Sequence, residues 1–273
     1  MRRSLLLAAS AALLLSPPGT AAAQPASRTL VAVLAHADDE GAAAPVLARY
    51  AREGAKVYLL IASDGAQGAG QQGHLQRPDS TRPGQELARV RAEEARCAAQ
   101  ALGAQPPIFL GFPDGKLGDY VGDRSLAYRL TQRMAEELGR LRPDAIVTWG
   151  PDGGVGHPDH RMVSNIVTQL SRAGAPGVPE RVFYMYLPVE GIRAMNPQRG
   201  EPPLVIPQAK YFTVRVSFTP DDLAASQRSM VCHKSQFKPE AIERVFPVQA
   251  SAWKGVIALV PAFATAPGTD LFP

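Results

Sequence analysis

The chain has 273 residues, of which 45% are hydrophobic and 20% charged, and its formal net charge is +4. The recurring apolar runs exclude a disordered chain, and the scattered basic residues give no sign of a nucleic-acid partner. With two cysteines, a metal centre built from a cysteine cluster is also excluded, so any metal must be held by histidines and carboxylates.

The first residues have the three-part pattern of a secretory signal peptide. Met1-Arg2-Arg3 is basic, Leu5 to Leu15 is apolar, and Ala21-Ala22-Ala23 supplies the small residues of a cleavage site. The apolar run is shorter than the roughly 20 residues that cross a bilayer. An uncleaved anchor or an Ala-rich tail is the alternative. We expect a signal peptide over 1–23 and one exported domain over 24–273, periplasmic or extracellular, with no stable membrane span.

Short apolar runs alternate with helix-like stretches along the rest of the chain. The alternation predicts βαβ units, and therefore a Rossmann-like, three-layer α/β fold with a mostly parallel sheet. The predicted strands are Leu30–Ala35, Val57–Ala62, Ile108–Leu110, Ala145–Trp149 and Val182–Leu187. The predicted helices are Gly41–Gly54, Gln85–Gly103, Arg124–Leu141 and Asp159–Ala173. Ligands of such sheets bind beyond the carboxyl ends of the strands, so the segments after each strand are where chemistry is expected.

Other segments are less informative. Loops as long as Gln67–Pro83 are often functional, so this one either forms the rim of a substrate site or has no such role. Tyr211–Ser217 is predicted to be an edge strand, and the chain after Phe237 supports no assignment. Cys97 and Cys232 both fall in helix-like segments; they form either one bridge or two buried free thiols.

Four ionisable residues follow the first predicted strand, in the sequence Ala35-His36-Ala37-Asp38-Asp39-Glu40. His36 and Asp39 are three apart on a turn, so both can point into one coordination sphere of zinc or a related ion. Asp38 then lies beside the metal, where it can accept a proton from water. Helix capping by Asp38 or Asp39 explains the same residues equally well.

A second polar motif, His157-Pro158-Asp159-His160, follows the fourth predicted strand and a glycine-rich loop. Proline suits the first turn of a helix, so the two histidines share one face of a helix start. One can bind a metal while the other faces the substrate, and Asp159 can orient an imidazole. Two exposed surface histidines are the alternative. The parallel sheet, however, brings both motifs to the same edge, which favours a metal site.

The motif Ala35-His36-Ala37-Asp38-Asp39-Glu40 resembles the AHPDDE signature of the PIG-L/LmbE family of metal-dependent de-N-acetylases, with Ala37 where the family usually has proline. His157-Pro158-Asp159-His160 resembles its second metal motif. Further similar segments are Arg91-x-x-Glu94 to Leu102-Gly103, Leu110 to Gly115, and His233-Lys234-Ser235-Gln236. The resemblance covers roughly Leu30 to Gln236, and its paired motifs are specific.

The resemblance implies a Zn²⁺ hydrolase that removes the acetyl group from an N-acetylglucosamine-type sugar or glycoconjugate. By position, His36, Asp39 and His160 would be the metal ligands. Asp38 would be the general base, and a protonated His157 would face the reacting carbonyl. The expected leader would place the substrate, a small molecule or a glycan, outside the cytoplasm.

Further candidates come from single residues near strand ends. Asp114 either binds sugar hydroxyls, supports His157 or only shapes its turn. Asp64 and Arg91 either line the rim of the site, support its ligands or have a structural role. His233 is a weaker candidate for the site. Two other functions fit the same residues: a metallo-amidase or esterase acting on a non-sugar substrate, and a non-catalytic, metal-supported glycan-binding protein.

Overall fold

The computed structural model describes residues 28–68, 84–119, 124–195 and 207–272. The predicted signal peptide, the greater part of the Gln67–Pro83 loop and the Pro/Gly-rich stretch before Pro207 lie outside these residues. Among the described helices, none is both long and apolar enough to cross a membrane.

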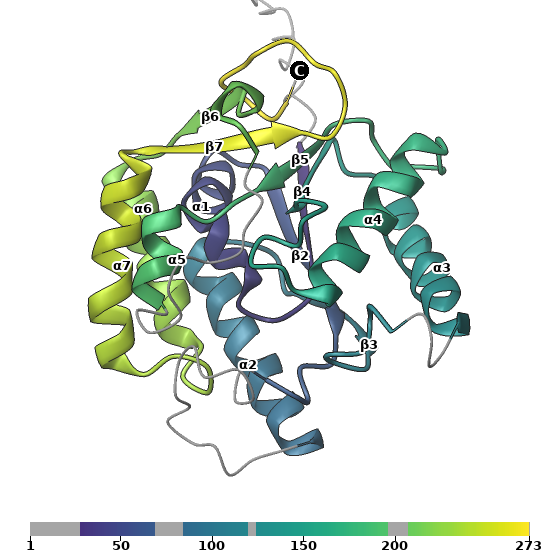
Figure 1. Ribbon diagram of the computed structural model, residues 1–273, viewed down its shortest axis with the longest axis horizontal. Coiled ribbons are helices and arrows are strands. Elements are labelled where there is room, and N and C mark those ends of the chain that lie inside the picture. The colour runs from purple at the N-terminus through teal and green to yellow at the C-terminus, as the bar shows by residue number, and fades with distance from the viewer. Residues whose placement is uncertain (1–27, 69–83, 120–123, 196–206, 273) are drawn as a thin grey trace, which may run out of the picture.

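A seven-stranded sheet with strand order β3-β2-β1-β4-β5-β7-β6 forms the centre of the fold (Figure 1). Strands β1 to β5 are parallel, whereas β7 is antiparallel to both β5 and β6. The strands are β1 Thr29–Leu34, β2 Lys56–Ser63, β3 Ile108–Phe112, β4 Ala145–Trp149, β5 Val182–Met185, β6 Val214–Ser217 and β7 Val256–Pro261. The predicted α/β fold with a mostly parallel sheet is therefore confirmed.

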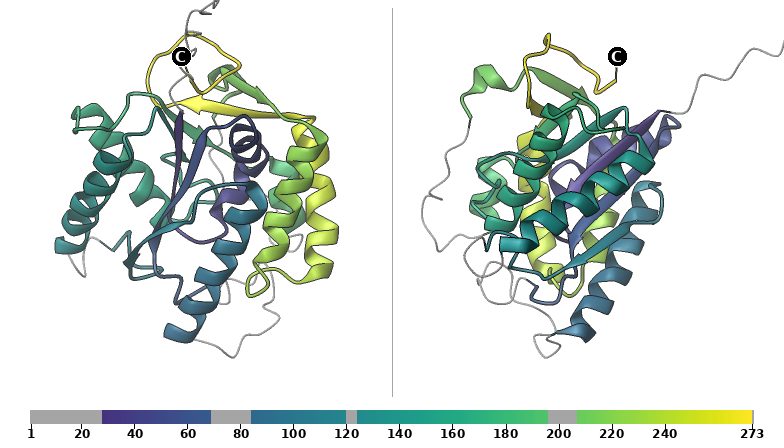
Figure 2. Two further views of the ribbon diagram at one scale, coloured as in Figure 1. Left: turned by 180° about the vertical axis from the view of Figure 1, so that it is seen from behind. Right: turned by 90° about the vertical axis from the view of Figure 1, so that its right-hand side faces the viewer.

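Helices cover both faces of the sheet, as Figures 1 and 2 show, with α3 and α4 on one side and α1, α2, α6 and α7 on the other. Strands β1, β4 and β5 are buried along nearly their whole length, which explains why these runs carry almost no polar side chains. The helices are α1 Ala44–Arg52, α2 Gln85–Leu102, α3 Arg124–Leu141, α4 Pro158–Arg172, α5 Val189–Met195, α6 Pro220–Cys232 and α7 Pro239–Trp253, with 3₁₀ turns η1 Asp39–Ala42 and η3 Ala209–Tyr211.

The structure adjusts several predicted bounds. The first predicted helix, from Gly41, is divided into η1 and α1, and the fifth strand ends at Met185 instead of Leu187. The edge strand predicted within Tyr211–Ser217 is present as β6. Sequence reasoning assigned nothing after Phe237, where α7 and β7 lie. Trp253 of α7 and Leu259 of β7 are buried in the same core as α1, so this segment completes one face of the sheet.

A disulfide between Cys97 and Cys232 joins α2 to α6, with 5.7 Å between the Cα atoms. This settles the open alternative in favour of one bridge. The link spans 135 positions of the sequence, so it ties a late helix to an early one.

The strand order changes direction between β1 and β4, because the chain proceeds outward through β2 and β3 and then returns to β4 on the other side. This is the topological switch point at which open α/β sheets bind ligands. Both polar motifs lie there: one follows β1, and the other begins α4 after β4.

Candidate active site

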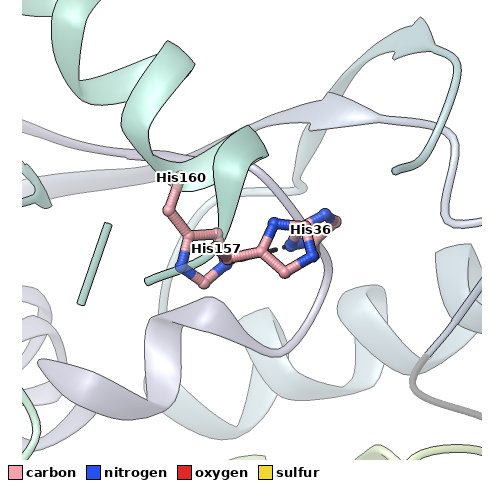
Figure 3. A group of neighbouring side chains, drawn as sticks. All are labelled: His36, His157 and His160. Atoms are coloured by element: carbon pink, nitrogen blue, oxygen red, sulfur yellow. Dashed lines mark hydrogen bonds between the residues drawn. The ribbon is translucent and has the colours of Figure 1, made fainter. Parts of the chain in front are cut away.

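Three imidazole rings converge at the switch point (Figure 3). His36 comes from the turn after β1, and His157 and His160 come from the start of α4. The ring centroid of His36 lies 4.7 Å from that of His157 and 5.1 Å from that of His160. The two motifs that the sequence placed at one edge of the sheet are thus in contact.

Asp39 shapes the turn that carries His36. Its Oδ2 accepts the backbone N–H groups of Ala35 and His36 at 2.9 and 2.8 Å, which leaves Oδ1 to face Nε2 of His160 at 3.0 Å. Burial alone would raise the pKa of Asp39, but His160 and His36 hold it well below the usual value. Within the described part of the chain, Asp38 makes no side-chain capping bond to η1. Helix capping therefore does not explain this motif.

Two carboxylates fix the orientation of His36. Its Nε2 lies 3.1 Å from Oδ1 of Asp114 and 3.3 Å from Oδ2 of Asp159. Because carboxylates only accept, Nε2 carries a ring proton, and in the neutral ring the lone pair is on Nδ1. Burial disfavours the charged ring, yet bonds to Asp114, Asp159 and Asp39 raise the pKa of His36 well above its usual value. The surroundings of His36 therefore favour a positive charge.

His160 is held from two sides. Its Nδ1 donates to the carbonyl of Gly153 at 2.9 Å, so the lone pair of Nε2 points toward Asp39. The indole of Trp149 stacks on the ring with a centroid distance of 4.7 Å and an interplanar angle of 3°. Gly154 lies against this indole, where a Cβ would meet the ring at 2.4 Å; no larger residue fits without a shift.

The three residues expected to bind a metal lie close enough together to share one divalent ion. Nδ1 of His36 is 3.1 Å from Nε2 of His160 and 3.8 Å from Oδ1 of Asp39, and the latter two atoms are 3.0 Å apart. A tetrahedral zinc ion with bonds of about 2.0–2.1 Å holds its ligand atoms about 3.3 Å apart. Three acceptor atoms this close repel one another unless a proton or a metal cation lies among them. All three side chains are at least nine-tenths buried.

Asp38 lies beside this group on a left-handed turn, with φ +117°. Such a conformation is unfavourable for a residue with a side chain and is concentrated at functional sites. Its Oδ1 is 3.4 Å from Arg91, which also donates to the carbonyl of Ala37 at 2.9 Å. Burial raises the pKa of Asp38 to about 6; Arg91 opposes this shift, and Asp39 adds to it. A carboxyl with such a pKa can both accept and return a proton near neutral pH.

His157 is the N-cap of α4, and its Nδ1 accepts the backbone N–H of Asp159 at 3.1 Å. Burial lowers the pKa of His157 to about 4, and the nearby His36 and His160 add to this effect. The ring is therefore neutral near pH 7 and carries its proton on Nε2. The sequence-based expectation was a protonated His157; the burial of the ring beside two other histidines opposes that charge.

The remaining candidates have supporting contacts. Asp114 contacts His36 and not His157, the partner considered for it, and its Oδ2 accepts from Arg91. Asp159 also accepts the N–H groups of Gly115 and Gly118. Asp64 accepts from the backbone of Ala66 and Asp114, so it shapes the turns beneath the site. His233 contacts Glu40 at 2.7 Å.

Sequence reasoning gave no role to two residues that the structure places here. Glu40 is 1% exposed and accepts the backbone N–H of Asp38. Trp149 stacks on His160. The signals were present, since Glu40 is the fourth ionisable residue of its motif and Trp149 ends a strand next to the second motif. Neither signal, however, shows which residue Glu40 or Trp149 contacts.

Comparison with known proteins agrees with the family resemblance of the two sequence motifs. Residues 31–171 match the family described as GlcNAc-PI de-N-acetylase (PIG-L). A 1D-myo-inositol 2-acetamido-2-deoxy-alpha-D-glucopyranoside deacetylase from Kineococcus radiotolerans is 32% identical over 235 residues, which cover 68% of this chain and 63% of that protein. A deacetylase of the same description from Corynebacterium urealyticum is 28% identical over 79% of this chain and 72% of its own.

Solved structures share the fold. N,N'-diacetylchitobiose deacetylase from Pyrococcus horikoshii has a TM-score of 0.60 at 18% identity, over 89% of this chain and 88% of its own. A 4-carboxy-2-hydroxymuconate hydratase from Pseudomonas putida has a TM-score of 0.55 at 18% identity, over 88% and 98%. Because these proteins differ in activity, similarity at this level concerns the fold alone.

Proposed function

Because the chain belongs to the PIG-L family, described as GlcNAc-PI de-N-acetylases, we propose that it is a metal-dependent hydrolase that removes an acetyl group from an N-acetylglucosamine-type sugar or glycoconjugate. The observation that carries this proposal is the convergence of His36, Asp39 and His160 with the carboxyl of Asp38 beside them. Relatives named as deacetylases of an acetamido-sugar support the substrate class.

Zinc is the metal we propose, held by Nδ1 of His36, Oδ1 of Asp39 and Nε2 of His160. Two imidazoles and one carboxylate are a common catalytic zinc set, and three protein ligands leave a position open. A divalent ion there polarises a carbonyl oxygen and lowers the pKa of a water molecule. Asp114 and Asp159 orient His36, the Gly153 carbonyl orients His160, and the backbone of the first motif orients Asp39.

Asp38 acts as the general base. It takes a proton from the water that adds to the acetyl carbonyl carbon, and a base with a pKa near the working pH suits this step. Arg91 and the left-handed backbone hold its carboxyl next to the ligands. A non-catalytic glycan-binding protein has no need of a carboxyl in this position.

His157 binds the reacting oxygen. Its Nδ1 is occupied by the Asp159 N–H, so its Nε2–H is the group available to donate as negative charge develops on that oxygen. The C–N bond then breaks, and acetate and the free amine form once the nitrogen has gained a proton. Asp38, which has just taken a proton from water, returns it, because the neutral His157 has no second proton to give.

The test combines metal analysis of the purified protein with acetate release from a panel of N-acetylglucosamine derivatives, other amides and esters. We expect about one metal per chain and turnover confined to the acetamido-sugars. Turnover of the non-sugar amides or esters alone would replace the sugar proposal with the metallo-amidase or esterase alternative. The Asp38→Asn variant, which keeps the shape of the side chain, should bind the metal normally and lose about 10²–10⁴-fold in rate. Near-normal turnover by this variant would refute the mechanism.

We also propose that the protein acts outside the cytoplasm. The leader pattern in residues 1–23 supports this, and so does the Cys97–Cys232 disulfide, since such bonds persist mainly in oxidising compartments. Fractionation of cells that express the full chain, with N-terminal sequencing of the product, checks it. We expect a periplasmic or secreted protein that begins near Gln24, and a cytoplasmic, full-length product would overturn the proposal.

A further inference from the structure

The peptide that joins Ala37 to Asp38 is held at both ends. Its carbonyl accepts from Nη2 of Arg91 at 2.9 Å, and its N–H donates to Oε2 of Glu40 at 3.1 Å. Fixing the plane of this peptide restrains φ of Asp38, which is +117°, an unfavourable value for a residue with a side chain. The direction of the Asp38 side chain therefore depends on Arg91 and Glu40.

The other oxygen of Glu40 is held by helix α6. Oε1 accepts the hydroxyl of Ser229 at 2.8 Å and the Nε2–H of His233 at 2.7 Å. Glu40, Ser229 and His233 are each 1% exposed, so water cannot take over these bonds. A buried carboxylate that loses one donor loses a charge-assisted bond and moves toward the remaining partners.

The end of α6 is fastened to α2 on both sides of His233. Cys232 precedes it and is bonded to Cys97, and Ser235 follows it and donates both its N–H and its hydroxyl to Glu94 at 2.6 Å. Arg91 and Glu94 lie three residues apart in α2, on neighbouring positions of one helix face. One support of the Ala37–Asp38 peptide, Arg91, thus belongs to α2, and the other, Glu40, is held by α6, which is joined covalently to α2.

The motif His233-Lys234-Ser235-Gln236 lies beyond the 31–171 match, and the proposed chemistry does not use it. We propose that His233 is a positioning residue: through Glu40 it holds the Ala37–Asp38 peptide so that the Asp38 carboxyl points at the reacting water. This inference rests on the proposed function, in which Asp38 is the base. Similar motifs have proline where this chain has Ala37. The bonds from Arg91 and Glu40 to the Ala37–Asp38 peptide keep this turn rigid without the proline ring.

Two substitutions at His233 test this. His233→Leu removes the donor to Glu40, whereas His233→Gln places an amide N–H near the position of Nε2. We expect His233→Leu to lower kcat about 10–100-fold through misplacement of Asp38, with KM and metal content unchanged within about twofold. His233→Gln should recover most of the lost rate. Ser229→Ala, which removes the weaker donor and fits the helix well, should cause a smaller loss of kcat in the same direction.

Thr219→Ala is the matched control. Thr219 caps the other end of α6 and does not contact Glu40, so this variant should lower the melting temperature without a change in kcat. If His233→Leu acted only by weakening α6, the two variants would behave alike. In that case, or if His233→Leu and Ser229→Ala both kept kcat within about twofold, the inference is wrong.

A double-mutant cycle separates this inference from the proposed function. In an Asp38→Asn background, His233→Leu should cause little further loss of rate, because the group it positions is already gone. Equal losses in both backgrounds would overturn the positioning role of His233 and leave the base intact. Normal turnover by Asp38→Asn would instead refute the proposed mechanism, whatever the His233 variants show.

Discussion

Nδ1 of His36 and Nε2 of His160 lie 3.1 Å apart, although 124 positions separate the two residues in the sequence. Each ring has its other nitrogen bonded to an acceptor, Asp114 or Asp159 for His36 and the Gly153 carbonyl for His160. When both rings are neutral the two facing nitrogens are acceptors, so a proton or a metal cation between them stabilises their closeness.

Removing one of these rings should remove the metal. We expect His160→Ala to reduce the metal content from about one per chain to near zero and to abolish acetate release, since two ligands bind a divalent ion far more weakly than three. Elemental analysis after dialysis measures this. Asp38→Asn serves as the comparison, because it should keep its metal. Full metal content in His160→Ala would show that His160 is not a ligand.

Asp114 should influence the metal without binding it. Asp114→Asn weakens the bond that orients His36, so we expect a 10–100-fold lower metal affinity in competition with a chelator. Asp144→Asn is the control, since Asp144 binds the first backbone N–H of β1 at the opposite end of the strand. Equal affinities of the Asp114 and Asp144 variants would mean that Asp114 has no such effect.

The disulfide should contribute strongly to stability. It closes a loop of 135 residues, and removing a bond of this kind costs about 2–5 kcal/mol. We expect Cys97→Ser to lower the free energy of unfolding by this amount in urea titration of the full chain. A reducing agent should bring the wild type to the same value and leave the variant unchanged. A variant as stable as the wild type would show that the bond is absent in solution.

The stability supplied by Asp222 should depend on pH. Its carboxylate accepts from Thr219 in the cap of α6 and pairs with Arg52. Burial opposes ionisation, but these bonds outweigh it and lower the pKa of Asp222 below 3.8. The stability gained is thus complete above the unfolded pKa of 3.8 and is lost as the pH falls through the lower folded value.

Asp222→Asn should accordingly cost about 1 kcal/mol at pH 7, and the difference from the wild type should shrink as the pH falls below about 4. Urea titrations of both proteins between pH 7 and pH 3 measure it. A difference that stays constant over this range would contradict the assignment of the pKa shift to these bonds.

Much of the fold follows from local patterns. Runs such as Val57–Ala62 are apolar because helices cover both faces of the strand, and the alternation with helical stretches predicts parallel pairing. Beyond Phe237 this reasoning found nothing, since β7 pairs antiparallel with both β5 and β6 and so departs from the parallel βαβ pattern. Its position depends on contacts that no local pattern encodes.

The sequence by itself determined which residues lie at the ends of β1 and β4, and hence that His36, Asp38, Asp39, His157 and His160 share one edge of the sheet. A parallel sheet brings its strand ends together whatever the loops do. Only the tertiary structure decided that Asp114 and Asp159 face His36, that burial lowers the pKa of His157, that Cys97 bonds Cys232 and that Glu40 joins Asp38 to His233. These partnerships are set by how distant loops and helices cross and by what their packing buries. Residue spacing along one segment carries no information about either.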